Sequence, residues 1–152
     1  MSKSYKLQLI DDSDFDVSLE KVRFENVDVS EGLPVDAEIK LRTKDSYKIK
    51  KITNDRLELE FKREKFFEPA IFFVVEVVLS ISYALKPSKN EDKIRIIEED
   101  LKNESYRLLT PGTTKASMII SFLTSINFKV PVVDPPFFLE DDEFRRLKGS
   151  VK

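Results

Sequence analysis

The stretch that most constrains the fold is AIFFVVEVVLSISYAL at residues 70–85, in which every odd-numbered position is apolar. The even-numbered positions mix apolar residues with Glu76, Ser80 and Ser82. Successive side chains of a strand point to opposite faces, so a period of two predicts one long strand with a fully buried face and a half-buried face. The run is shorter than a membrane span needs and carries a glutamate at its middle, which predicts burial inside protein.

Three earlier segments alternate apolar and polar residues in the same way, at residues 15–24, 37–52 and 55–67. In the first segment the apolar residues change from odd to even positions after Leu19. We therefore expect a bulge or bend near Glu20 and Lys21 that keeps both sets on one face. Four strands in succession, with no helix between them, predict an antiparallel meander at about residues 5–86.

The pattern changes to a helical period after residue 90, where apolar residues three and four apart predict a short amphipathic helix. Thr110 followed by Pro111 is typical of an N-cap and a first helical position, so we expect a longer helix to begin there and end at Phe128. Three prolines between residues 131 and 136 then exclude further helix, and FKVPVVDPP is expected to run extended. A short C-terminal helix would complete a helical part at about residues 90–147.

The chain is therefore predicted to have an α+β fold. We expect a four-stranded antiparallel sheet, then a long helix and a short C-terminal helix, in a single domain over residues 1–152.

The long helix has no charged face. Apolar side chains cover most of its circumference, and small hydroxyls fill the remainder, at Ser117, Ser121 and Thr124 or Ser125. Such a helix has no side meant for water, so we expect one face to cover the sheet and the other to contact a second subunit. The residues expected at that oligomer interface are Ser117, Ile120, Ser121 and Thr124. A helix buried inside one subunit is the alternative, but four strands and two helices offer little material to enclose it.

Composition excludes several kinds of site. The chain has 26 Lys+Arg and 28 Asp+Glu, and its net charge of −2 gives no general reason to bind nucleic acid. It contains no His and no Cys, which removes the usual zinc ligands, disulfides and the Ser-His and Cys-His nucleophile pairs. Its three glycines lie far apart, so no phosphate-binding loop is expected. The N-terminal segment lacks the apolar core of a signal peptide, and cytoplasm is the expected compartment.

Carboxylates remain as candidates for chemistry. Glu76, inside the buried strand, is the one candidate for an acid–base residue, although a glutamate paired with a cation is the simpler interpretation. The acids at residues 140–143 could bind a divalent cation, but a solubilising helix start is the more frequent reason for such a run. An enzyme is the least favoured class, and we expect no metal and no cofactor.

Two stretches resemble the SecB protein-export chaperone family. LLTPGTTKASMIISFLTSINFKVPVVDPPFFL at residues 108–139 is similar to that family's proline-opened long helix, proline-containing connection and aromatic pair before the last helix. DVSLE at residues 16–20 is similar to an acidic element on the family's first strand. The resemblance implies a cytoplasmic homo-oligomer, typically a dimer of dimers, that binds unfolded polypeptides for export without ATP. It also implies that Asp16 and Glu20 contact the SecA motor ATPase.

The resemblance further implies that client segments lie in apolar grooves between the sheet and the C-terminal helices. The chain has 12 Phe and no Trp, and Phe suits such a groove because it is wide, apolar and has no polar atom that needs a partner. The residues expected to bind clients are Phe66, Phe67, Phe72, Phe122, Phe128, Val132, Phe137, Phe138 and Leu139. Alternatively, the adjacent Phe pairs simply bridge two packed layers. The alternative function is a regulatory or scaffold adaptor with one specific partner, as in toxin–antitoxin-associated members of the fold.

Overall fold

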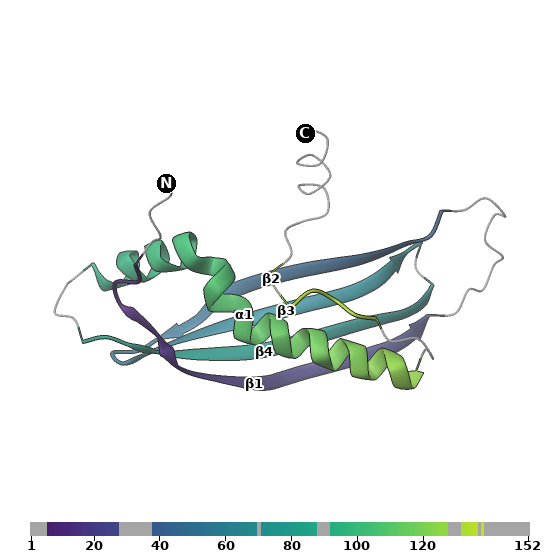
Figure 1. The fold of residues 1–152 in the computed structure, drawn as a ribbon, viewed down its shortest axis with the longest axis horizontal. Helices are drawn as coiled ribbons and strands as arrows, with labels where there is room; N and C mark the ends of the chain where they lie inside the picture. Colours follow the sequence, from purple (N-terminus) through teal and green to yellow (C-terminus); the bar gives the residue numbers. More distant parts are fainter. Residues whose placement is uncertain are drawn as a thin grey trace.

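The computed structural model describes residues 6–27, 38–69, 71–87, 92–127, 132–136 and 138. Its elements are β1 (Ile10–Val27), β2 (Lys40–Ile52), β3 (Arg56–Glu68), β4 (Phe72–Leu85) and α1 (Lys93–Asn127). Figure 1 shows two layers, with α1 lying obliquely across one face of the four-stranded sheet. The predicted α+β fold, an antiparallel sheet followed by a long helix, is confirmed. The expected C-terminal helix lies outside the described residues.

The strands are arranged in the order β1-β4-β3-β2, and every neighbouring pair is antiparallel. The expected meander holds for β2, β3 and β4, but β1 pairs with β4 instead of β2, which corrects the plain meander. This order places the most apolar strand inside the sheet, where both of its backbone edges are hydrogen-bonded. It leaves β2, with the lysine-rich sequence KLRTKDSYKIKKI, at an edge where charged side chains oppose pairing with other chains.

The burial of the two faces of β4 agrees with the alternation of residues in its sequence. All of its odd-numbered residues are buried in the core that also contains residues of α1. Full burial of a large apolar side chain is worth about 1.5–3 kcal/mol, so this face makes a major contribution to folding. On the opposite face Glu76, Val78 and Ser80 are buried as well, whereas Phe72 is exposed.

The bulge predicted in β1 is present. Leu19 pairs with Leu79 and Lys21 pairs with Val78, which leaves Glu20 as the extra residue. Directly paired residues share a face, so one inserted residue switches the parity of the strand. Apolar side chains before and after the bulge therefore lie on the same face as the buried side chains of β4.

Two helices were expected in succession, and α1 does consist of two helical stretches joined by a kink, but the kink lies at Glu104 and not at Thr110. The backbone of α1 is interrupted only by non-helical φ/ψ values of −127° and 31° at Glu104, and Pro111 lies inside the helix. Thr110 is not an N-cap, because its hydroxyl donates to the carbonyl oxygen of Tyr106 at 2.7 Å. A threonine inside a helix can bond back to the residue four earlier, and the Thr-Pro pattern alone does not distinguish this case from a cap.

Close contact between α1 and the sheet occurs at Gly112. A Cβ atom there would lie 2.7 Å from Cδ1 of Ile81 and 3.4 Å from a ring carbon of Phe61. Any side chain at this position would force the helix or Ile81 to move. The absence of a side chain therefore sets the distance between α1 and the centre of the sheet.

The start of β1 is fastened to α1 by a buried carboxylate. Backbone N–H groups of Gln8, Leu9 and Ile10 donate to Asp100, with the first bond at 3.0 Å and the last at 3.3 Å. Hydrogen bonds to a charged acceptor are stronger than neutral ones. This contact joins the chain just before β1 to a residue near the beginning of α1.

Candidate functional site

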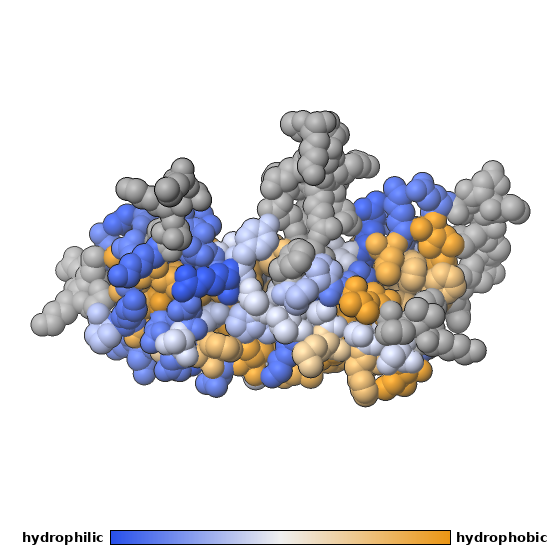
Figure 2. Space-filling view, in the orientation of Figure 1, coloured by the Kyte–Doolittle hydropathy of each residue, from blue (hydrophilic) through white to orange (hydrophobic). Residues whose placement is uncertain are grey.

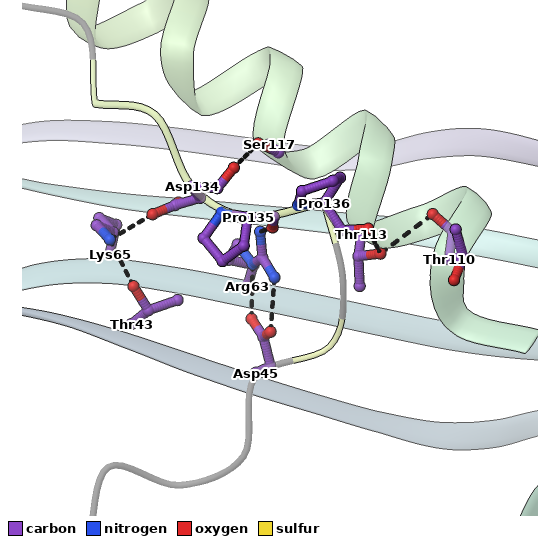
Figure 3. Close-up of polar contacts among 10 residues, drawn as sticks. All are labelled: Thr43, Asp45, Arg63, Lys65, Thr110, Thr113, Ser117, Asp134, Pro135 and Pro136. Atoms are coloured by element: carbon purple, nitrogen blue, oxygen red, sulfur yellow. Dashed lines mark hydrogen bonds and ion pairs between the residues drawn. The ribbon is translucent and has the colours of Figure 1, made fainter. Parts of the chain in front are cut away.

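A proline-containing segment lies across the helix-covered face of the sheet. Residues 132–136, here called the VVDPP segment, run between α1 and β3 (Figure 3). They contain no helix, as their prolines predict. Asp134 is buried and Val132 and Pro135 are half-buried, whereas Val133 is 78% exposed and Pro136 is exposed too. Polar contacts from both neighbouring elements hold it in place.

Two cations of β3 contact the VVDPP segment. Arg63 is fully buried, and its Nε and Nη2 atoms donate to the two carboxylate oxygens of Asp45 at 2.7 Å each. Its Nη1 atom donates to the backbone oxygen of Pro135 at 3.0 Å. Lys65 forms an ion pair with Asp134. Buried charges are tolerated only when they are paired, so both cations depend on these carboxylates.

Hydroxyl groups of α1 bind the backbone of the same segment. Thr113 and Ser117 donate to backbone oxygens within it, at 2.7 and 2.5 Å. Thr124 accepts a hydrogen bond from the N–H of Val132 at 2.7 Å. The three hydroxyls are four and seven residues apart along α1, which places them on one face of the helix.

The small-residue face of α1 is therefore used within the chain. Ser117, Ile120 and Thr124 are buried, and Ser121 is half-buried. These residues were expected to contact a second subunit. Ser117 and Thr124 bind the backbone of the chain's own VVDPP segment, and contact with a second subunit stays a prediction. A different face of α1, which includes Met118, Phe122 and Ile126, is left exposed.

Sequence reasoning missed Arg63 and Lys65, although a signal was available. Both occupy odd-numbered positions of β3 and so continue the buried face of Leu57, Leu59 and Phe61. Cations in phase with a buried apolar face indicate a buried polar contact, because an unpaired charge is not tolerated there. The partner on the VVDPP segment has no comparable signal in the sequence.

Aromatic rings cluster where β3 ends and β4 begins. The ring centroid of Phe67 lies 5.0 Å from that of Phe72 and 5.1 Å from that of Phe73. Phe24 of β1 stacks on Phe73 at 5.4 Å. Phe66 lies on the opposite face of the sheet, as expected for the neighbour of Phe67 in a strand. The two predicted Phe residues of this pair are therefore not part of one surface.

The backbone at Phe72 is strained. Its φ angle is 61°, and the N–H of Phe73 donates to the backbone oxygen of Ile71 at 2.8 Å across it. A positive φ is unfavourable for a bulky side chain, and such positions cluster at functional sites. The turn holds the exposed ring of Phe72 against Phe67.

Exposed apolar side chains form two surfaces. The end patch consists of Ile39, Leu41 and Phe72 together with the half-buried Phe67. The helix-edge surface consists of Met118, Phe122 and Ile126 of α1 and of Phe15, Leu19 and Val22 of β1. Figure 2 shows hydrophobic residues at the end of the sheet where β2 begins and along the side where α1 lies over β1.

Residues expected to bind clients are spread over several places. Phe138 is half-buried, and its ring centroid lies 5.7 Å from that of Tyr47, 6.2 Å from Phe61 and 6.5 Å from Tyr106. Val132 is half-buried in the VVDPP segment, and Phe122 belongs to the helix-edge surface. Three others lie outside the described residues, namely Phe128, Phe137 and Leu139.

The face of the sheet opposite α1 is charged. Its central carboxylate, Glu76, is buried and lies 3.4 Å from Lys21, 3.7 Å from Arg23 and 3.8 Å from Lys62. Glu76 lines a hollow of about 670 Å³ on this face together with Lys21 and Lys62. Glu76 is thus paired with cations, which is the simpler of its two interpretations.

The two acids expected to contact a motor protein form ion pairs within the chain. Asp16 lies 3.6 Å from Arg56, and Glu20, at the bulge of β1, lies 2.6 Å from Lys50 of β2. The hydrogen bond to Glu20 raises the pKa of Lys50. Because β1 and β2 are opposite edges of the sheet, the pair between Glu20 and Lys50 spans its width. Contact with a motor stays a prediction.

Within the ranges that the structure describes, no three acidic side chains come together as a metal site. The acids at residues 140–143 lie outside these ranges. In the same described part of the chain, no helix is both long and apolar enough to cross a membrane.

Comparison with known proteins bears on the fold. No protein-family model and no curated protein matches the sequence. A SecB-like chaperone from Mycobacterium tuberculosis, solved with a ChAD peptide from the HigA1 antitoxin, aligns at 10% identity and a TM-score of 0.51 over 82% of this chain and 87% of that one. This chain has the SecB-like fold. A protein of unknown function from Streptococcus agalactiae aligns at 12% identity and a TM-score of 0.44, over 80% of this chain and 98% of that one.

The resemblance found in the sequence is thus confirmed at the level of the SecB-like fold. The strand order and the long helix carry this likeness, since few residues are identical.

Proposed function

We propose that the chain is an ATP-independent holdase that binds unfolded or pre-export polypeptides in the cytoplasm. The observation that carries this proposal is the end patch, where Ile39, Leu41 and Phe72 are 43%, 40% and 43% exposed. These side chains demand no hydrogen-bond pattern, so they accept many client sequences. Covering them with a client removes apolar surface from water, which is worth about 25 cal/mol per Å².

The strained turn at Phe72 supports the same proposal. A glycine would adopt a φ of 61° without strain, yet the position holds a large exposed ring. Strain retained at an exposed aromatic side chain is explained by a role in binding more readily than by a role in folding.

The same proposal includes self-association of the chain through the helix-edge surface. Met118, Phe122 and Ile126 follow one another at a spacing of four, so they form a stripe on α1, and each is 63–67% exposed. β1 lies at an edge of the sheet, beside this stripe. A second copy that pairs along β1 would cover the stripe and the apolar side chains of β1 together. A dimer of dimers needs one further contact of this chain with itself.

An adaptor with one specific protein partner is the second candidate function. It is favoured by the solved SecB-like chaperone, whose bound peptide comes from an antitoxin. A SecA-type motor is a further proposed partner for Asp16 and Glu20. Glu20 would have to exchange its ion pair with Lys50 for a contact with the motor.

The decisive experiment is suppression of light scattering by several unrelated unfolded proteins, with and without ATP. A holdase suppresses aggregation of all of them equally well without nucleotide. The double variant Leu41→Ser/Phe72→Ser should lose this activity. Ile94→Ser removes an even more exposed apolar side chain, 60% exposed and far from the end patch, and should keep the activity.

The two candidate functions differ in breadth. Failure of the wild-type chain to protect any of the unfolded proteins would overturn the holdase proposal. One tight protein partner without general protection would establish the adaptor.

A further inference from the structure

The VVDPP segment occupies a site that is built to hold an extended peptide. Three successive backbone oxygens of the segment each accept one hydrogen bond from a side chain of β3 or α1 (Figure 3). The bonds run from Ser117 to Asp134 at 2.5 Å, from Arg63 to Pro135 at 3.0 Å and from Thr113 to Pro136 at 2.7 Å. Hydrogen bonds to backbone oxygens recognise the path of the backbone and place little constraint on the side chains of the peptide.

The site donates hydrogen bonds to two residues of the segment that have no backbone N–H, Pro135 and Pro136. Pro135 and Pro136 lack N–H groups, so nothing on their nitrogen atoms needs an acceptor. Pro135 is half-buried, and an ordinary residue there would bring in an N–H that needs an acceptor of its own. Proline at this position therefore fits the site better than other residues do.

One side chain of the segment is recognised by charge. The carboxylate of Asp134 is buried and pairs with Lys65, and Lys65 also donates to the hydroxyl of Thr43 at 2.5 Å. Among the residues that the structure describes, buried oxygen Oδ2 of Asp134 has no hydrogen-bond partner. The site thus selects an acidic residue, and it satisfies the carboxylate of the chain's own segment incompletely.

Polar contacts keep the VVDPP segment in place together with the packing of Val132 against the core. Val133 and Pro136 are exposed, so their side chains contribute little to holding it. A second peptide with the same features would form the same bonds that the segment gives up. Exchange between the two is then governed by their relative concentrations and fit.

We infer that this site also binds extended polypeptide segments in which an acidic residue precedes a proline, in place of the chain's own VVDPP segment. The proposed ligand class rests on the polypeptide binding proposed above and narrows it. The VVDPP segment acts as an internal competitor that a matching client displaces. Clients without the acidic residue and the proline bind at the end patch alone.

The test is a titration of the full chain with a fluorescein-labelled peptide VPVVDPPFFL, followed by fluorescence anisotropy. The variant Asp134→Ala weakens the internal competitor, so it should bind this peptide about tenfold more tightly than wild type. A peptide with Asn in place of Asp should bind that variant about tenfold more weakly, because it cannot pair with Lys65. Glu98→Ala removes an exposed acid elsewhere on α1 and should behave as wild type.

Two results would overturn the proposed ligand class. One is equal affinity of wild type and Asp134→Ala for the labelled peptide, and the other is equal affinity of Asp134→Ala for the Asp and Asn peptides. If circular dichroism shows that Asp134→Ala has lost its helix, hydrogen exchange on the wild-type chain decides instead. Excess unlabelled peptide should speed exchange at the N–H of Val132, which is bonded to Thr124, and unchanged protection counts against displacement.

The peptide titration and the aggregation assay fail independently. If the chain suppresses aggregation but does not bind the labelled peptide as expected, only the proposed ligand class is overturned. If the chain exchanges its segment for the peptide but does not suppress aggregation, only the holdase proposal is overturned.

Discussion

The ion pair between Arg63 and Asp45 allows the effect of a buried charge to be measured directly. Both side chains are 0% exposed, and the two hydrogen bonds between them are 2.7 Å long. Replacing Asp45 by Ala leaves the guanidinium in the interior without its bidentate partner. Removing one partner of a buried pair costs about 3–5 kcal/mol. That is a large fraction of the total unfolding free energy of about 5–15 kcal/mol for a typical domain.

The assay is urea unfolding followed by circular dichroism. With a slope of about 2 kcal/mol per M, Asp45→Ala should lower the midpoint by about 1.5–2.5 M. Protein concentration has to be equal in all samples, because self-association shifts apparent stability. Asp16→Ala is the matched control, since this acid is 87% exposed and its pair with Arg56 lies at the surface. Exposed pairs contribute about 0–1 kcal/mol, so its midpoint should move by about 0.5 M or less.

A double substitution separates desolvation from the attraction between the charges. Arg63→Met with Asp45→Leu replaces the pair by apolar side chains, and such replacements are often neutral or stabilising. The double variant should therefore be more stable than Asp45→Ala alone, although it loses the hydrogen bond from the charged guanidinium to Pro135, worth about 1.5–3 kcal/mol. If Asp45→Ala lowers the midpoint no more than Asp16→Ala, then Arg63 reaches water and the reasoning is wrong.

Four further outcomes are expected. Gly112→Val should lower the unfolding free energy by about 1–3 kcal/mol in urea titrations, because its Cβ would clash with Ile81; unchanged stability would mean that the helix shifts freely. Asp100→Asn should cost about 1–3 kcal/mol and speed hydrogen exchange at residues 8–10, which bond to this carboxylate. Burial raises the pKa of Tyr83, so the stability it contributes is complete below the ordinary value of 10.0 and is lost at higher pH; Tyr83→Phe should flatten this loss in urea titrations from pH 9 to 11. Phe122→Ser should shift the mass measured by light scattering toward that of one chain, and an unchanged mass would exclude the helix-edge surface as the interface.

The strands were predictable because the alternation of apolar and polar residues in each one shows which of its faces is buried. The fully apolar odd face of residues 70–85 and the change of parity at Glu20 both reappear in the sheet, the second as a one-residue bulge. Pairing order was not predictable in the same way, because alternation shows which face is buried but not which strand lies alongside. The position of β1 next to β4 depends on contacts between residues far apart in the sequence.

The site was predictable only in its outline. The prolines near residue 135 predicted an extended segment, but the small hydroxyls of α1 have two uses that look identical in a sequence. They can admit a neighbouring helix or a backbone, and here they bind the backbone of the VVDPP segment. The cations of β3 were overlooked because only the apolar side chains of residues 55–67 were assigned to the buried face, although Arg63 and Lys65 share their parity.

The strand order also affects how the chain is made. Val27 at the end of β1 pairs with Phe72, and Ile10 at its beginning pairs with Leu85. At about 5–20 residues per second, a ribosome needs several seconds to synthesise the stretch between these partners. During that interval β1 has no partner strand, and the carboxylate of Asp100 that fastens its beginning has not yet been added. A nascent chain of this protein therefore carries an unpaired strand with apolar side chains for seconds, and such a strand is prone to pair with other chains during that time.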